Sequence, residues 1–221
     1  MSNIYESGAG DALLNPIVHT TAIRDYLEAE RAFIQQHVSD YDALVETGCS
    51  AGRYAACALD SNKQYIGIDR VARYLAEGMR HYPRATFVAA DIKNITGILP
   101  LYLQPSRKPL IVVPFNLVGT LAEPLQFLNE LSATGHHFLL FSFNTDAAAT
   151  EARAEYYTTS GFDDLHHHEE EDGVLFTSPS GLHSFAYTEA WFENAFRQLS
   201  VPLHKTAIGV IGTAYGNFRF F

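Results

Sequence analysis

Three acidic residues stand where they could hold a ligand. Glu46, Asp69 and Asp91 each lie at the end of a short apolar run, and a turn between Gly48 and Gly52 follows the first of them. Good helix formers come directly after this turn. A glycine turn before a helix exposes backbone N–H groups and lets a ligand approach the main chain closely. We therefore expect this part of the chain to bind a nucleotide-like ligand.

Three known patterns compete for the glycine turn. Its spacing does not match Gly-x-Gly-x-x-Gly, the pattern of dinucleotide-binding folds. The segment Gly48-Cys-Ser-Ala-Gly52 does match Gly-x-Ser-x-Gly, in which Ser50 would be the nucleophile of a serine hydrolase. With Glu46 included, the same segment is similar to the acidic-x-Gly-x-x-x-Gly turn of S-adenosylmethionine methyltransferases.

The elements around the turn favour a parallel sheet. Apolar runs alternate with helical patterns, and such alternation indicates strands joined by crossover helices. The runs are continuously apolar, as is typical of parallel strands buried on both faces. The expected strands are 43–46, 64–69, 86–90, 110–115 and 137–143, and the expected helices are 53–59, 71–82, 121–131 and 147–159.

A helix is also expected before the first strand. Thr20 or Thr21 is a candidate cap, and apolar residues then recur at helical spacing. The pattern predicts that Ile23, Tyr26, Leu27, Ile34 and Val38 face the domain and that Arg24, Glu28, Glu30 and Arg31 lie on the other side. Residues 1–19 read as an irregular arm.

The pattern changes after about residue 147. A hairpin is predicted between 165–170 and 174–178, and a third short strand over 183–187. A helix follows the cap Thr188, and strands 205–211 and 217–221 are expected to form a final hairpin. We therefore predict an α/β, Rossmann-like, doubly wound and mostly parallel sheet with an antiparallel C-terminal hairpin, an N-terminal helical arm and a small antiparallel β insertion before the last helix.

Length, net charge and cysteine content limit the kinds of protein that this sequence can encode. A length of 221 residues fits one domain, 1–221, with an arm and helix (1–39), a cofactor-binding core (40–145) and an insertion over the substrate site (162–187). The net charge of −10 argues against a nucleic-acid partner. Two cysteines, no visible signal peptide and no long apolar run predict a cytoplasmic protein that does not enter a membrane.

The order of elements separates the three patterns. In serine hydrolases the serine elbow comes after several strands, whereas Ser50 follows the first one, and no glycine-rich oxyanion segment precedes it. Glu46, Asp69 and Asp91 instead lie at the carboxyl ends of consecutive strands, where open α/β sheets bind their ligands. Each acid could also simply cap a helix or lie in a solvated loop.

Over about residues 40–145, and more loosely to 221, the chain resembles the Rossmann-like S-adenosylmethionine-dependent methyltransferases. The resemblance implies that Gly48, Cys49 and Gly52 line the methionine part of S-adenosyl-L-methionine, with Glu46 near its amino group. It also implies that Asp69 holds the ribose, Arg70 flanks the adenine, Asp91 and Ile92 meet the adenine, and Asn116 and Leu117 lie beside the reactive methyl. Thr47 and Ser50 complete the predicted cofactor site.

Two departures from the family are visible. The family turn often has glycine where Ser50 stands. Val113-Pro-Phe-Asn116 differs from the Asn/Asp-Pro-Pro-Tyr motif of amino-directed DNA methyltransferases. Together with the acidic charge, this difference favours a small-molecule acceptor over a nucleic acid.

The predicted activity is methyl transfer to a nitrogen or oxygen of a small molecule, with S-adenosyl-L-homocysteine as product. Such transfer needs alignment more than a fixed catalytic residue, so no catalytic residue is assigned. The substrate-side candidates are Tyr5, His19, Asn144, His183 and Tyr187. Alternatives are a protein or nucleic-acid methyltransferase, a serine hydrolase and a non-catalytic cofactor-binding module. The acceptor and the oligomeric state stay open.

A metal site is not expected. His166, His167 and His168 are adjacent to an acidic run. Neighbouring residues of a strand point to opposite faces, so three adjacent histidines do not converge easily on one ion.

Overall fold

A computed structural model describes residues 4–220 of the chain. The strands of its main sheet are β1 (Ala43–Thr47), β2 (Gln64–Asp69), β3 (Thr86–Ala89), β4 (Pro109–Val113), β5 (His137–Phe143), β9 (His204–Ile208) and β10 (Gly212–Gly216). Their order is β3-β2-β1-β4-β5-β10-β9. The first five strands run parallel, and β10 runs antiparallel to both of its neighbours. The predicted fold class is confirmed.

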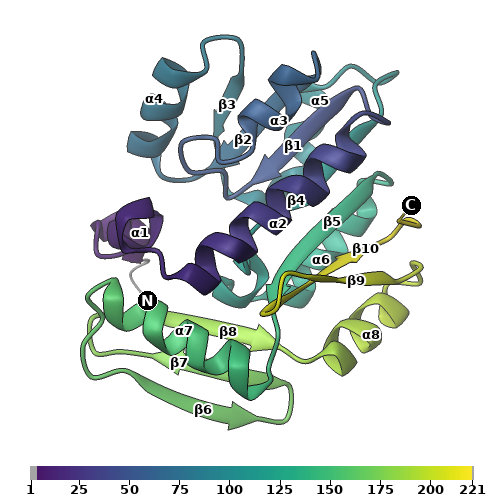
Figure 1. Ribbon diagram of the computed structural model, residues 1–221. Coiled ribbons are helices and arrows are strands. Elements are labelled where there is room, and N and C mark those ends of the chain that lie inside the picture. The colour runs from purple at the N-terminus through teal and green to yellow at the C-terminus, as the bar shows by residue number, and fades with distance from the viewer. Residues whose placement is uncertain (1–3, 221) are drawn as a thin grey trace.

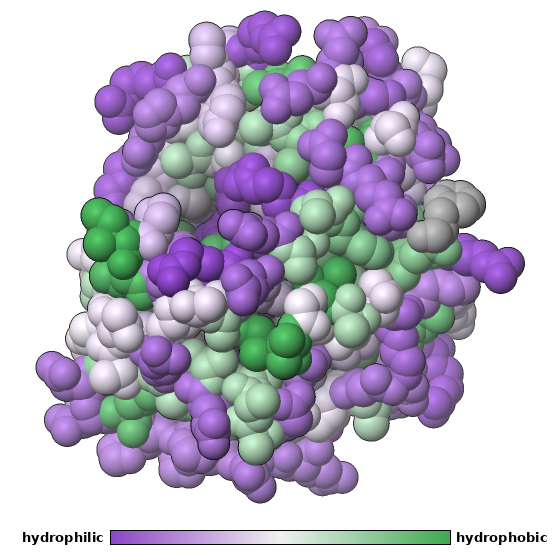
Figure 2. Space-filling view, viewed as in Figure 1, coloured by the Kyte–Doolittle hydropathy of each residue, from purple (hydrophilic) through white to green (hydrophobic). Residues whose placement is uncertain are grey.

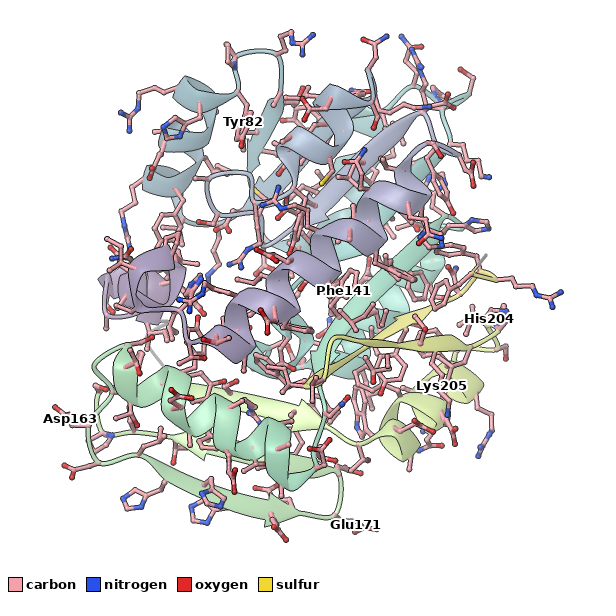
Figure 3. The ribbon with its side chains drawn as sticks, in the orientation of Figure 1. Tyr82, Phe141, Asp163, Glu171, His204 and Lys205 are labelled. Carbon is pink, nitrogen blue, oxygen red and sulfur yellow. The ribbon has the colours of Figure 1, made fainter. Side chains whose placement is uncertain are left out.

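Helices cover both faces of this sheet (Figure 1). The helices on one face are α2 (Thr21–Val38), α3 (Ala55–Asp60) and α4 (Ala72–His81), and those on the other are α5 (Ile95–Tyr102), α6 (Pro124–Ala133) and α8 (Glu189–Gln198). Phe141, labelled in Figure 3, points from β5 into the layer under α2. The two apolar layers are largely separate, as the continuous apolar strands require.

One prediction for α2 is wrong. The side chain of Thr20 caps the helix by accepting from the Ile23 N–H at 3.4 Å, as expected. Glu30 is fully buried, although we expected it on the charged side. It lies four residues from both Tyr26 and Ile34, so the helical period itself carries it onto the buried stripe.

The predicted insertion is a small sheet of its own. It follows α7 (Ala147–Thr159) and contains β6 (His166–Glu170), β7 (Gly173–Thr177) and β8 (His183–Tyr187), all antiparallel. Figure 1 shows this sheet and α7 beyond the ends of β4 and β5. Strand β8 packs against the short helix η4 (Leu117–Thr120), which follows β4. The insertion therefore borders the place where the parallel strands end.

The N-terminal arm is more regular than predicted. It contains α1 (Ile4–Ser7), η1 (Asp11–Leu14) and η2 (Pro16–Val18), whereas residues 1–3 lie outside the described part. The side chain of Arg73 in α4 donates to the carbonyls of Tyr5 and Glu6 and pairs with Asp11. These contacts tie the arm to the domain between α4 and α7 (Figure 1).

The last strand is displaced from its predicted place. We expected it over 217–221, but β10 comprises Gly212–Gly216, and Phe221 lies outside the described residues. The turn before β10 uses Gly209 at a φ of +58°, and Gly212 lets the Tyr26 ring pack against the backbone. Phe218 contributes its ring instead, stacking on His137 with 4.9 Å between ring centroids. Within residues 4–220, none of the helices combines the length and apolar character needed to span a bilayer.

Candidate functional site: the carboxyl ends of strands β1 to β4

The predicted cofactor residues meet at one edge of the sheet. Strand β1 lies between β2 and β4. The chain adds β2 and β3 on one side of β1 and then crosses over to add β4 and β5 on the other side, so the order of the strands switches at β1. Open α/β sheets bind ligands in the crevice outside such a switch point. The turn after β1 has left-handed backbone at Gly48 (φ +61°), Ser50 (φ +51°) and Gly52 (φ +89°). A left-handed Ser50 is strained where the family often has glycine.

Close packing explains two of the glycines. A Cβ atom on Gly48 would lie 2.8 Å from Leu117 Cδ2, so the turn passes directly under the segment that follows β4. A Cβ on Gly67 would lie 2.7 Å from Cys49 Sγ. The Cys49 thiol therefore faces β2, and its burial raises the pKa of this thiol well above its usual value. Only the backbone of Cys49 is free to line a ligand.

Glu46 is a buried acid with one unused oxygen. Its Oε2 accepts hydrogen bonds from Tyr65 Oη at 2.6 Å and from the Tyr54 N–H at 2.9 Å. Its Oε1 is buried and has no hydrogen-bond partner among the described residues. Burial raises the pKa of Glu46 to about 7. An unpaired buried oxygen beside the glycine turn fits the ammonium group of an amino acid.

Asp69 holds the turn together. Its Oδ2 accepts from the Ser50 N–H and its Oδ1 from the Val71 N–H, both at 2.9 Å. Each carboxylate oxygen can accept a further bond, because an ionised carboxylate offers about four lone-pair positions. The side chain thus lies at the end of β2 and retains capacity for hydroxyl donors.

The next two predicted residues have local partners. Asp91 is exposed and caps η3 (Ile92–Asn94) by accepting from the Lys93 N–H at 3.0 Å, which is the helix-capping role considered above. Arg70 forms an ion pair with Glu6 at 2.7 Å and so joins the arm to the end of β2. Ile92 is buried.

Asn116 is occupied by the protein itself. Its Nδ2 donates to the Phe185 carbonyl at 2.9 Å, and its Oδ1 accepts from Ser142 Oγ at 3.0 Å. The residue has a left-handed φ of +58° and is 2% exposed. Its side chain therefore positions β8 and β5 around the end of β4, and Leu117 is the member of the predicted pair that faces the turn.

The substrate-side candidates divide into two groups. His19 is buried, donates to the Leu13 carbonyl at 3.2 Å and packs edge-on against Tyr156. Burial raises the pKa of Tyr5 to about 12, and the charges of Arg53 and Asp69 act on this phenol. The charge of Arg53, next to Gly52, acts on both residues, so both lie near the glycine turn.

The other three candidates are directed elsewhere. Asn144 accepts from Thr213 in β10 at 2.8 Å, Tyr187 stacks on Trp191 of α8 with 3.8 Å between ring centroids, and His183 is exposed. The structure does not bring these three together with Tyr5 and His19.

The histidine run lies on an exposed strand. All five residues of β6 are exposed, and Asp163 and Glu171 lie at opposite ends of this strand in Figure 3. The lower rim of the molecule is mostly hydrophilic in Figure 2. Within residues 4–220, no three His, Cys, Asp or Glu side chains are grouped so that they could hold a metal ion.

Two residues at the strand ends were missed as site residues. Glu30 of α2 accepts from the Phe115 N–H at 3.1 Å through Oε1, whereas its buried Oε2 has no partner among the described residues. Burial raises the pKa of Glu30 to about 8. Arg53, the residue after Gly52, places its guanidinium carbon 4.9 Å from the Phe115 ring centroid. The buried stripe of α2 could have indicated Glu30, but no sequence signal indicated Arg53.

The buried acids predict a pH dependence of stability. Glu30 and Glu46 have folded-state pKa values of about 8 and about 7, above the usual 4.5, so the folded protein binds more protons than the unfolded chain between these limits. Stability should therefore be highest near pH 5 and fall as the pH rises to 8.5. We expect Glu30→Gln to reduce this fall by on the order of 2 kcal/mol.

Urea unfolding at pH 5.5 and 8.5 measures this dependence. Glu28→Gln is the matched control, because Glu28 is exposed on the same helix. If the free energy of unfolding falls between pH 5.5 and 8.5 as much for Glu30→Gln as for the unsubstituted protein, the assignment of a buried, protonated Glu30 is wrong.

Two surface hollows lie away from this edge. One of about 340 Å³ lies between α8 and β9 and another of about 180 Å³ between α3 and α4. Neither is lined by a predicted site residue. The strand ends are instead covered by the arm, which Tyr156 of α7 also holds through a 2.6 Å hydrogen bond to the Leu13 carbonyl. A ligand at the glycine turn would therefore be shielded from water by residues 4–18.

The comparison with solved structures found proteins of the same fold. No protein-family model matches the sequence, and no curated protein matches it either. Solved structures do match: an S-adenosylmethionine-dependent methyltransferase from Clostridium acetobutylicum ATCC 824 is 13% identical, with a TM-score of 0.58 over 97% of this chain and 98% of that one.

Two further neighbours have names that include a small molecule. The 1,6-didemethyltoxoflavin-N1-methyltransferase from Burkholderia thailandensis is 13% identical, with a TM-score of 0.57 over 98% of this chain and 90% of that one. An amino pentose methyltransferase from Micromonospora echinaspora is also 13% identical, with a TM-score of 0.53 over 99% and 98%. The chain therefore has the Rossmann-like fold of the S-adenosylmethionine-dependent methyltransferases.

Proposed function

We propose that this protein is an S-adenosylmethionine-dependent methyltransferase that acts on a nitrogen or oxygen atom of a small molecule. The observation that carries the proposal is the unpaired, buried Glu46 Oε1 beside a turn whose Gly48 admits no side chain. An amino-acid ammonium would satisfy this oxygen, and the turn leaves its backbone open to the rest of the cofactor. The predicted cytoplasmic location belongs to the same proposal.

The proposed roles follow from the positions of the residues. Glu46 would bind the amino group of the cofactor, the turn from Thr47 to Gly52 would hold its methionine part, and Asp69 would accept from the ribose hydroxyls. When bound, S-adenosylmethionine supplies an electrophilic sulfonium methyl group. The chain's own contribution is alignment and the exclusion of water by the arm, so no general base is assigned.

A small acceptor is favoured by three observations. The arm and the β6–β8 insertion border the strand ends, which leaves little access for a macromolecule. The net charge of −10 disfavours a phosphate backbone. Among the fold neighbours, the toxoflavin enzyme was solved with 1,6-didemethyltoxoflavin and S-adenosylhomocysteine bound, and another neighbour is named a sugar N-methyltransferase.

Titration calorimetry tests the proposal directly. We expect micromolar binding of S-adenosylmethionine and S-adenosylhomocysteine and no binding of NAD. If neither S-adenosylmethionine nor S-adenosylhomocysteine binds, the proposed methyltransferase function is wrong. A fluorophosphonate probe would then test Ser50, although its Oγ has no hydrogen bond to a histidine among the described residues, as an activated serine nucleophile would need.

Replacing Asp69 by alanine should weaken S-adenosylhomocysteine binding by about 1–3 kcal/mol, because charge-assisted hydrogen bonds are lost. Asp60→Ala, which removes an exposed charge at the end of α3, is the control. Calorimetry gives the affinity, and a melting curve shows whether the loss of the Ser50 and Val71 contacts has loosened the fold. Unchanged affinity would take the ribose role from Asp69.

A further inference from the structure

The guanidinium of Arg53 is a cation without a hydrogen-bonding partner among the described residues. Its guanidinium makes no hydrogen bond and no ion pair with any residue between 4 and 220. The side chain is only partly exposed and lies over the Phe115 ring, 4.9 Å from its centroid. The guanidinium nitrogens are not among the buried polar atoms that lack a partner, so they still reach solvent, and their five N–H donors are open to an acceptor that approaches from there.

The nearest acids do not supply this acceptor. The charge of Arg53 lowers the pKa values of Glu30 and Glu46, yet no oxygen of either lies within 4 Å of the guanidinium. Burial outweighs the attraction and leaves these pKa values at about 8 and about 7. Glu30 and Glu46 thus act on the guanidinium only through space, and the guanidinium N–H groups are not used by either acid.

Three aromatic residues surround Arg53, and they come from the segment after β4, from the N-terminal arm and from α7. Phe115 follows β4, Tyr5 comes from the arm and Tyr156 from α7, and the charge of Arg53 acts on both phenols. Burial raises their pKa values, so both phenols are neutral. Phe115 and Tyr156 pack edge to face, with 5.9 Å between ring centroids. The guanidinium thus lies over the Phe115 ring and close to two neutral phenols.

We propose that Arg53 binds a carboxylate of the methyl acceptor, so that this protein methylates small aromatic or apolar carboxylic acids. The inference rests on the proposed methyltransferase function. A planar guanidinium matches a carboxylate with two parallel hydrogen bonds, and the surrounding aromatic rings suit the apolar body of such a molecule. The net charge of −10 does not prevent this, because charges beyond roughly 8 Å are largely screened in physiological salt.

The test compares acids with their amides. The protein is saturated with S-adenosylhomocysteine, and benzoate, benzamide, phenylacetate and phenylacetamide are titrated by calorimetry. We expect each acid to bind more tightly than its amide, and Arg53→Gln to reduce this preference about tenfold or more. Arg53→Lys, which keeps the charge but not the planar fork, should retain part of it.

Arg31→Gln is the matched control. Arg31 is exposed and lies over the Tyr54 ring, so this variant removes a nearby positive charge without touching the three aromatic residues around Arg53. It should keep the preference for acids. Melting curves show whether each variant is folded.

Three results would overturn the inference. One is the absence of any preference for acids in the unsubstituted protein. A second is equal preference with Arg53→Gln. The third is that Arg53→Gln weakens S-adenosylhomocysteine but not its decarboxylated analogue, which would assign the guanidinium to the cofactor. Failure of the unsubstituted protein to bind S-adenosylhomocysteine would instead remove the proposed function.

Discussion

Gly119→Ala is expected to lower the free energy of unfolding by about 3 kcal/mol or more, at the upper end of what overpacking usually costs. A Cβ atom at this position would lie 1.7 Å from the Phe185 carbonyl oxygen, which is backbone and cannot rotate away. Strand β8 would have to move from η4, and the 2.9 Å bond from Asn116 Nδ2 to the same carbonyl would be lost. We expect methyl transfer to fall more than S-adenosylhomocysteine binding, because the glycine turn is untouched.

Gly97→Ala provides the control for this substitution. Gly97 lies in α5, and a Cβ atom there meets nothing within 4 Å. Alanine at this helical position should be neutral or stabilise by up to about 1 kcal/mol. Urea unfolding of the two variants measures the difference. Equal stabilities would mean that β8 does not pack on η4 in solution.

Arg153→Ala should destabilise the protein by about 3 kcal/mol or more. Arg153 of α7 is fully buried and donates to the carbonyls of Val174 at 3.2 Å and Ser184 at 2.8 Å. Its guanidinium carbon also lies 4.6 Å from the Phe176 ring centroid. Alanine would relieve the cost of burying a charge, but it leaves a large cavity and unpaired carbonyls where β7 and β8 meet α7.

Two measurements separate the effect of Arg153→Ala on the insertion from any effect on the cofactor site. Calorimetry with S-adenosylhomocysteine reports on the cofactor site, and thermal unfolding reports on the insertion. Arg197→Ala, at an exposed arginine of α8, should leave both unchanged. A melting temperature of Arg153→Ala close to that of Arg197→Ala would show that the guanidinium does not hold the insertion together.

Local patterns determined most of the fold. The predicted bounds of β2 and β5 agree with the structure to the residue, and both capping candidates that proved correct, Thr20 and Thr188, accept a backbone N–H three residues on. These features depend on neighbours along the chain, so propensity and periodicity reveal them. The doubly wound, mostly parallel arrangement could be predicted as well, because alternating strands and helices admit few topologies.

The glycine turn and Asp69 at the end of β2 were also readable in the sequence. They depend on a strand, a turn and a helix that are contiguous in the chain. The last strand could not be predicted, because Gly212 and its neighbours pair with β5 through contacts between distant segments. Residues 217–220 have a strand-like sequence but form no strand.

Tertiary structure decided which polar residues remain available to a ligand. Asn116 looked like a site residue, but Ser142 and Phe185, 26 and 69 residues away, use its side-chain atoms. Glu30 looked like a surface charge, but it accepts from Phe115, 85 residues away. Arg53 carried no signal, yet its guanidinium has no acceptor among residues 4–220. Sequence patterns record the period of an element, whereas the pairing of buried polar groups depends on which distant segments meet, and only the folded chain determines that.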